Sequence, residues 1–87
     1  TINIVALTNA AMTGAAMAEA LMIATEAKVI AVQSLGISSP VSGDLATGTG
    51  TDCTAIVCGQ ASPLIRYCGK HVLFGEILAK LVIETVT

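Results

Sequence analysis

The chain has 87 residues, of which 54% are apolar and only 11% are charged, with a formal net charge of −2 and a mean hydropathy of +0.83. This length allows one small unit at most, and soluble domains usually carry about 25% charged residues, so there is too little polar material to coat a free-standing globule. The net negative charge and the aromatic content of 2% argue against nucleic acid as a partner.

The apolar excess requires a covering surface. Charged residues interrupt every apolar stretch before the roughly 18 residues of a membrane span accumulate, so we expect no membrane span. The interrupting residues are Glu19, Glu26, Lys28, Glu76, Lys80 and Glu84. Another polypeptide must then cover the chain, either a further segment of the same gene product or identical neighbours. We therefore expect residues 1–87 expressed alone to aggregate or to form an oligomer.

Cysteine usage and the first residues bear on the compartment. Cys53, Cys58 and Cys68 are odd in number and match no zinc or redox spacing, so reduced thiols are expected. Thr1 leads directly into an apolar run without the basic segment that opens a signal peptide. Both features favour a cytoplasmic protein. Cys68 and His71 would give a metal only two ligands, so we expect no metal site.

The first half of the chain predicts a strand followed by a long helix. Residues 1–8 are β-branched and largely apolar, which is typical of a strand buried on both faces. Asn9 leads into a loop. Thr13 is a suitable N-cap for a helix that ends at Gly36, and this helix is apolar around most of its circumference.

The second half repeats that order. Residues 38–52 have the composition of a loop, residues 53–58 of a second buried strand, and residues 59–69 of a connector. Residues 71–86 form a second helix, on which Glu76, Lys80 and Glu84 make a solvated stripe. The expected fold is one layered α/β unit over residues 1–87, in the order β-α-β-α, with helices that cover buried strands.

Lys28 is placed by helical geometry. At about 100° per residue, Glu19, Glu26 and Gln33 line one face of the first helix, and Lys28 lies nearly opposite Glu26. If the glutamates are solvated, Lys28 points toward packed structure, where it pairs, meets a ligand or snorkels. Both a site role and snorkelling stay open.

The densest polar cluster is a threonine-glycine loop directly before the second strand. It consists of Thr47, Gly48, Thr49, Gly50, Thr51 and Asp52. Such a loop offers backbone N–H groups, hydroxyls and a carboxylate to a polar ligand. It lacks the lysine of a phosphate-binding P-loop, and it does not open a helix as a dinucleotide fingerprint does. From composition alone it is either an ordinary turn or a ligand site.

Four stretches resemble motifs of the adenosylcobinamide amidohydrolase family and occur in the family's order. They are Thr1-Ile2-Asn3-Ile4, Ala24-Thr25-Glu26-Ala27-Lys28, residues 46–52 (ATGTGTD), and Gly69-Lys70-His71 with Gly75-Glu76. The resemblance spans nearly the whole chain and corresponds to the C-terminal part of longer members. It implies that the chain is half of a larger domain, completed by the N-terminal segment or subunit of the same precursor. It also implies hydrolysis of the amide that joins the aminopropanol arm to the corrin ring, in corrinoid salvage.

A second resemblance concerns mechanism. The nucleophile-bearing subunit of self-processing ornithine acetyltransferases begins with a threonine and is similar at Thr1, at Thr8-Asn9-Ala10, at Gly43-Asp44 and in residues 47–52. It differs at Asn9, where an aspartate is usual. An N-terminal threonine can act as nucleophile because its own α-amine accepts the hydroxyl proton. The alternative is that the chain begins at Thr1 through an accidental proteolytic cut.

The expected site is centred on the first residue of the chain and on the threonine-glycine loop. Thr1 is the expected nucleophile, and Asp52 orients a hydroxyl or the free amine. The expected substrate-binding residues are Asn9, Lys28, Thr47, Gly48, Thr49, Gly50, Thr51 and His71, although His71 also suits a capping or surface role. The corrinoid is the substrate, and no cofactor is required. An N-acyltransferase, an aminopeptidase on a self-cleaved scaffold and a noncatalytic corrinoid-binding module remain alternatives.

Overall fold

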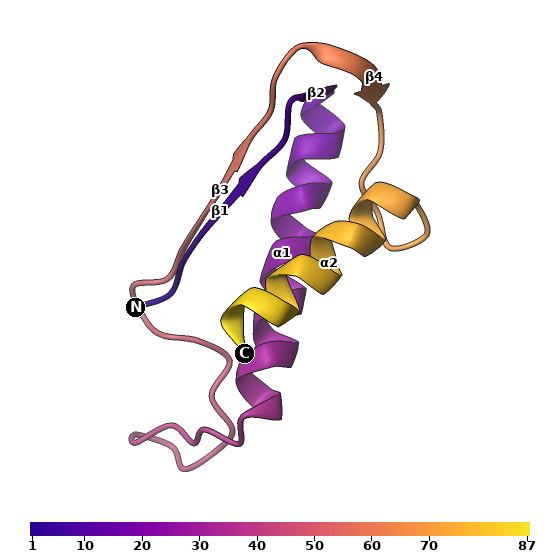
Figure 1. Ribbon diagram of the computed structural model, residues 1–87. Helices are drawn as coiled ribbons and strands as arrows, with labels where there is room; N and C mark the ends of the chain where they lie inside the picture. Colours follow the sequence, from indigo (N-terminus) through magenta and orange to yellow (C-terminus); the bar gives the residue numbers. More distant parts are fainter.

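The computed structural model describes residues 1–87 as two helices and four short strands. In chain order these are β1 (Asn3–Leu7), β2 (Ala10–Met12), α1 (Gly14–Ser34), β3 (Cys53–Val57), β4 (Ala61–Ile65) and α2 (Leu73–Val86). β1 pairs in parallel with β3, from Asn3 opposite Cys53 to Leu7 opposite Val57, and β2 pairs in parallel with β4. The chain is therefore a small α/β unit, as the sequence predicts (Figure 1).

The β2–β4 pair was not expected, because both strands lie in segments whose composition indicated loops. β2 consists of two alanines and a methionine, and β4 contains Pro63, so neither has a strand preference of its own. They pair because the neighbouring strands β1 and β3, which precede them in the chain, already hold the two segments side by side. Main-chain bonds from Ala61 N to Asn9 O (2.9 Å) and from Gly59 N to Ala10 O (3.0 Å) carry the pairing past the strand ends.

α1 begins and ends where the sequence predicts. The Thr13 hydroxyl accepts a hydrogen bond from Ala16 N at 3.1 Å, which caps the first turn. After Ser34, Gly36 adopts φ +69°, a left-handed conformation that favours glycine. The second helix was predicted to begin at His71. α2 begins at Leu73, because Val72 N bonds to Gly69 O (3.3 Å) in a turn that contains His71.

The core lies between the two helices and one face of the β1–β3 pair. Its buried residues are Ala16, Ala20, Ile23, Ala24, Ala27, Cys68, Leu78 and Val82. The alanines of α1 let α2 pack closely, and Ile4, Ala6 and Ile56 contact the core from the strands. Neither helix combines the length and the apolarity that a membrane crossing needs.

The sequence indicates strands buried on both faces, but within these 87 residues only one face of the β1–β3 pair is covered. Both helices lie on the same side of the β1–β3 pair (Figure 1). Val5 and Leu7, which point to the other side, are 61% and 76% exposed. One layer of helices can cover only one face of a sheet, so the outer apolar face of these strands is open.

Candidate functional site

The parallel pairing of β1 with β3 brings the first residues of the chain to the threonine-glycine loop. The register places Asn3 opposite Cys53, and Cys53 N donates to Ile2 O at 3.0 Å. The residues just before each strand, Thr1 with Ile2 and Asp52, therefore lie together at the amino ends of the strands.

The Asp52 carboxylate is the centre of this cluster. Oδ1 accepts from Ile2 N (2.9 Å) and from the Thr49 hydroxyl (2.5 Å). Oδ2 accepts from Thr49 N (2.8 Å) and from Lys28 Nζ (2.9 Å). The side chains of Lys28 and Asp52 are 12% and 10% exposed. Lys28 therefore does not snorkel to solvent, because its ammonium group pairs with Asp52.

These donors fix the charge of the carboxylate. The Thr49 hydroxyl, followed by the Lys28 ammonium and the Thr49 amide, holds the pKa of Asp52 far below its ordinary value, and this outweighs the opposing effect of burial. Asp52 is thus an anion at neutral pH. It can orient donors and stabilise positive charge, but it holds no proton to give and is a weak base.

Gly48 allows the ion pair to form next to the main chain. A Cβ at this position would overlap Asp52 Oδ2 and would lie 2.7 Å from Lys28 Nζ. Its φ of +156° is also a value that side-chain-bearing residues rarely adopt. The glycine is therefore needed for close approach of the loop to Lys28 and Asp52.

A chain of hydroxyl groups connects Thr1 to Asp52. The Thr1 hydroxyl pairs with the Thr51 hydroxyl, which lies 3.4 Å from the Thr49 hydroxyl. Because ionised Asp52 can only accept, Thr49 donates to it, and the oxygen of Thr49 is left to accept from Thr51. The oxygen of Thr51 can then accept from Thr1. This direction of donation polarises the Thr1 hydroxyl toward the carboxylate.

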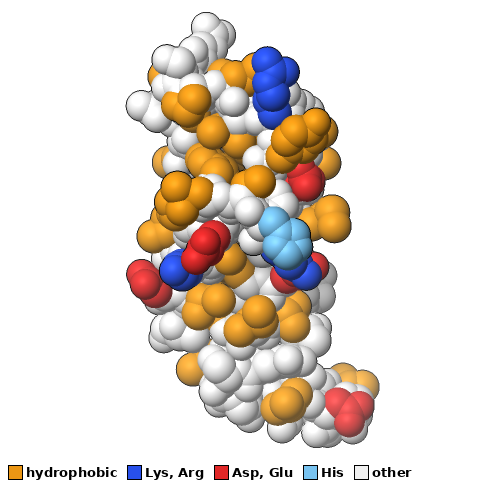
Figure 2. Space-filling view, turned by 90° about the vertical axis from the view of Figure 1, so that its right-hand side faces the viewer, with side chains coloured by type: hydrophobic (Ala, Val, Ile, Leu, Met, Phe, Trp, Pro, Cys, Tyr) orange, Lys and Arg blue, Asp and Glu red, His pale blue; other side chains and the backbone are white.

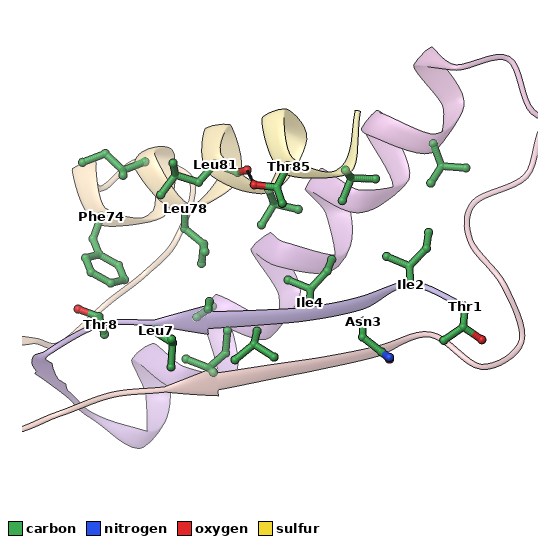
Figure 3. A pocket seen from close by; sticks show the side chains of 18 of the residues that line it. Thr1, Ile2, Asn3, Ile4, Leu7, Thr8, Phe74, Leu78, Leu81 and Thr85 are labelled. Atoms are coloured by element: carbon green, nitrogen blue, oxygen red, sulfur yellow. Dashed lines mark hydrogen bonds between the residues drawn. The ribbon is translucent and has the colours of Figure 1, made fainter.

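A large apolar groove begins at the same end of β1. It has a volume of about 990 Å³ and lies between β1 and α2, with 17 of its 21 lining residues hydrophobic. Figure 3 shows Phe74, Leu78, Leu81 and Thr85 of α2 along one side and Thr1 at one end. The threonine is thus a polar group at the rim of an apolar space.

Comparison with known proteins identifies the family. The family model described as adenosylcobinamide amidohydrolase matches residues 1–87. The chain belongs to this family of amidohydrolases. It is also 46% identical, over 87 residues, to an uncharacterized protein of Methanocaldococcus jannaschii. That match covers 99% of the chain and 34% of the relative, so the chain spans about a third of the relative's length. No solved structure matches.

The family match confirms the first resemblance seen in the sequence. The resemblance to ornithine acetyltransferases is not supported by these comparisons and stays a prediction. Corrinoid amide hydrolysis is the activity that the family name describes.

The predicted site residues lie in three different places in the structure. Thr1, Lys28, Gly48, Thr49, Thr51 and Asp52 come together, and Thr47 and Gly50 belong to the same loop. Asn9 lies beyond the opposite end of β1, and exposed His71 lies in the turn before α2. A substrate contact of Asn9 or His71 remains a prediction. No group of three or more His, Cys, Asp or Glu side chains could hold a metal ion.

Two parts of this region were not anticipated from the sequence. The Ile2 main-chain amide bonds to Asp52, and no side-chain pattern could have indicated it. The groove residues Phe74, Leu78 and Leu81 recur at helical spacing, which is a signal for one apolar face. That spacing alone does not tell a groove from a packed core.

Proposed function

We propose that the complete polypeptide hydrolyses the amide that links the aminopropanol arm to the corrin ring of adenosylcobinamide. The observation that carries this proposal is the family match over the whole chain. The corrinoid is then the substrate, and the residues described above require no cofactor for amide hydrolysis.

We assign the nucleophile to Thr1. The chain of hydroxyls that runs through Thr51 and Thr49 to Asp52 supports this assignment, because it orients the Thr1 hydroxyl and increases its polarisation. Since Asp52 is a weak base, the proton of the hydroxyl goes to the α-amine of Thr1, which must be free in the mature protein. The negative charge of Asp52 would stabilise the ammonium group formed nearby.

The reaction then balances in two steps. The Thr1 oxygen attacks the amide carbonyl, the C–N bond breaks, and the departing amine takes the proton held by the α-amine to leave as aminopropanol. Water next attacks the resulting ester and passes one proton to the α-amine; the C–O bond to Thr1 breaks, the corrinoid carboxylic acid leaves, and that proton goes to the Thr1 oxygen. Main-chain N–H groups of residues 47–51 are candidates to position the substrate, and donors to the carbonyl oxygen would come mainly from another segment.

The activity itself is tested first. The complete polypeptide is incubated with adenosylcobinamide, and the products are separated by mass spectrometry. Release of aminopropanol together with adenosylcobyric acid supports the proposal. Transfer of the acyl group to an added amine acceptor would indicate an acyltransferase, and binding without turnover would indicate a corrinoid-binding module. Either result would refute the hydrolase assignment.

The nucleophile is tested separately with variants at Thr1. A Thr1→Ala precursor should remain uncut before this residue and inactive, whereas Thr1→Ser keeps a hydroxyl at the same reach and should be cut. Thr25→Ala is the matched control, because the exposed Thr25 hydroxyl bonds only to Leu21 O within its own helix. Normal turnover by Thr1→Ala would place the nucleophile elsewhere and leave the amidohydrolase assignment intact.

Asp52 is tested by replacement with asparagine. The amide group cannot accept the four hydrogen bonds made by the carboxylate, and the charge opposite Lys28 is lost. We expect kcat to fall by about 100-fold through misplacement of Thr1, with a smaller change in stability. Unchanged turnover in Asp52→Asn would mean that the loop is an ordinary turn without a part in catalysis.

A further inference from the structure

The two helices are wider than the sheet that they cover. Packed helices lie about 8–10 Å apart, whereas neighbouring strands lie about 4.8 Å apart. The β1–β3 pair is therefore wide enough for one helix only. α1 packs against β3, while α2 faces the groove beside β1. In a layered α/β fold, that groove is the place where the sheet should continue.

The main chain of β1 has a free edge. Ile2 O and Thr8 N bond to Cys53 N and Val57 O of β3. Because successive residues of a strand direct their N–H and C=O groups to opposite edges, those of Val5 and Leu7 point away from β3. β1 is paired with β3 alone, so this row of donors and acceptors is available to another strand.

The side chains around this edge are apolar and uncovered. Leu81 and Ile77 of α2 are 55% and 48% exposed although they line the groove. On the face turned away from the strands, by contrast, charged groups and the histidine are interspersed among the apolar side chains (Figure 2). Parallel strands are found almost only in sheets that are covered on both faces. An occupant with an apolar surface and a strand's hydrogen-bonding edge therefore fits the groove.

We propose that one or two further β-strands pair with the free edge of β1 and lie beneath α2. We assign these strands to the part of the polypeptide that longer members of the family carry outside the matched residues. The M. jannaschii relative, of which the match covers 34%, has about two thirds of its length available for this purpose. The proposal concerns how the sheet is completed, and it holds whether or not Thr1 is the nucleophile.

The experiment uses the complete polypeptide that contains these residues, isotopically labelled for NMR. Hydrogen exchange is measured for the amides of Val5 and Leu7, with Ile4 and Ala6 as internal controls, since their amides face β3. We expect all four to be protected to within about tenfold of one another, as in an inner strand. We also expect nuclear Overhauser contacts from the Val5 and Leu7 amides to residues outside the matched 87.

Two outcomes would overturn the proposal. Exchange of Val5 and Leu7 at least 100-fold faster than that of Ile4 and Ala6 would mean that the edge of β1 is open. Protection that disappears when the protein is diluted from a dimer to a monomer would identify a second copy of the chain as the occupant. Protection that is independent of concentration, together with the expected Overhauser contacts, supports the added strands.

Discussion

Gly75 lies where the first turn of α2 meets the segment before it, and we expect Gly75→Ala to be destabilising. A Cβ on Gly75 would overlap Gly69 O and would lie 2.7 Å from Cys68 O. Both obstacles are main-chain atoms, and Cys68 is fully buried, so they cannot rotate aside as a side chain would. The glycine of this family motif therefore has a packing role.

The magnitude follows from two opposing effects. Overpacking of a tight contact costs up to about 3 kcal/mol, while replacing glycine by alanine in a helix returns at most about 1 kcal/mol. The net loss of unfolding free energy is about 2 kcal/mol. In a complete polypeptide about three times as long as this chain, like the relative that it matches, that corresponds to a fall in melting temperature of roughly 4–8 °C.

Gly14→Ala is the matched control, because Gly14 is also in the first turn of a helix but a Cβ added to it would meet nothing within 4 Å. This substitution should stabilise by about 0.4–1 kcal/mol. Both variants are compared with the wild-type protein by thermal and urea denaturation followed by circular dichroism. If Gly75→Ala melts at or above the wild-type temperature, the close approach of the main chains is wrong.

Three further outcomes are expected. The lowered pKa of Asp52 means that the ionised carboxylate stabilises the folded state fully above the ordinary value of 3.8, and that this stabilisation is lost as the pH falls below it. The difference in unfolding free energy between wild type and Asp52→Asn, measured by urea titration, should therefore shrink from pH 7 to pH 3. A constant difference would contradict the ion pair. Gly48→Ala should displace Lys28 from Asp52 and lower turnover at least as much as Asp52→Asn, whereas Gly14→Ala, where an added Cβ meets nothing within 4 Å, should leave turnover unchanged. Burial raises the pKa of the Cys68 thiol, so iodoacetamide should label Cys68 only after denaturation, as peptide mass mapping would show.

The main elements could be predicted because they depend on local sequence. β-branched residues favour β1, and Thr13 and Gly36 fix the ends of α1 through a side-chain hydroxyl and a left-handed glycine. β2 could not be predicted, because Ala10 and Ala11 have no strand preference and are ordered only by pairing with β4. Its formation is a consequence of tertiary structure.

The candidate site was predictable only where it depends on local sequence. Helical periodicity alone directed Lys28 toward packed structure, and the composition of residues 47–52 marked a polar loop. The partner of Lys28 could not be deduced, because it depends on the register between two strands joined by a long crossover. The groove between β1 and α2 depends on the position of α2 relative to the sheet, which periodicity does not give.

The parallel pairing of β1 with β3 has a consequence for the order of events during synthesis. Thr1 is translated before Asp52, and the two meet only after α1 and the following loop have closed the crossover. Contacts between such distant positions form late, because the entropy of loop closure must be overcome first. A nascent chain that ends before Asp52 therefore lacks the carboxylate and the hydroxyls that polarise Thr1. Any chemistry that depends on this cluster is restricted to chains that have already folded.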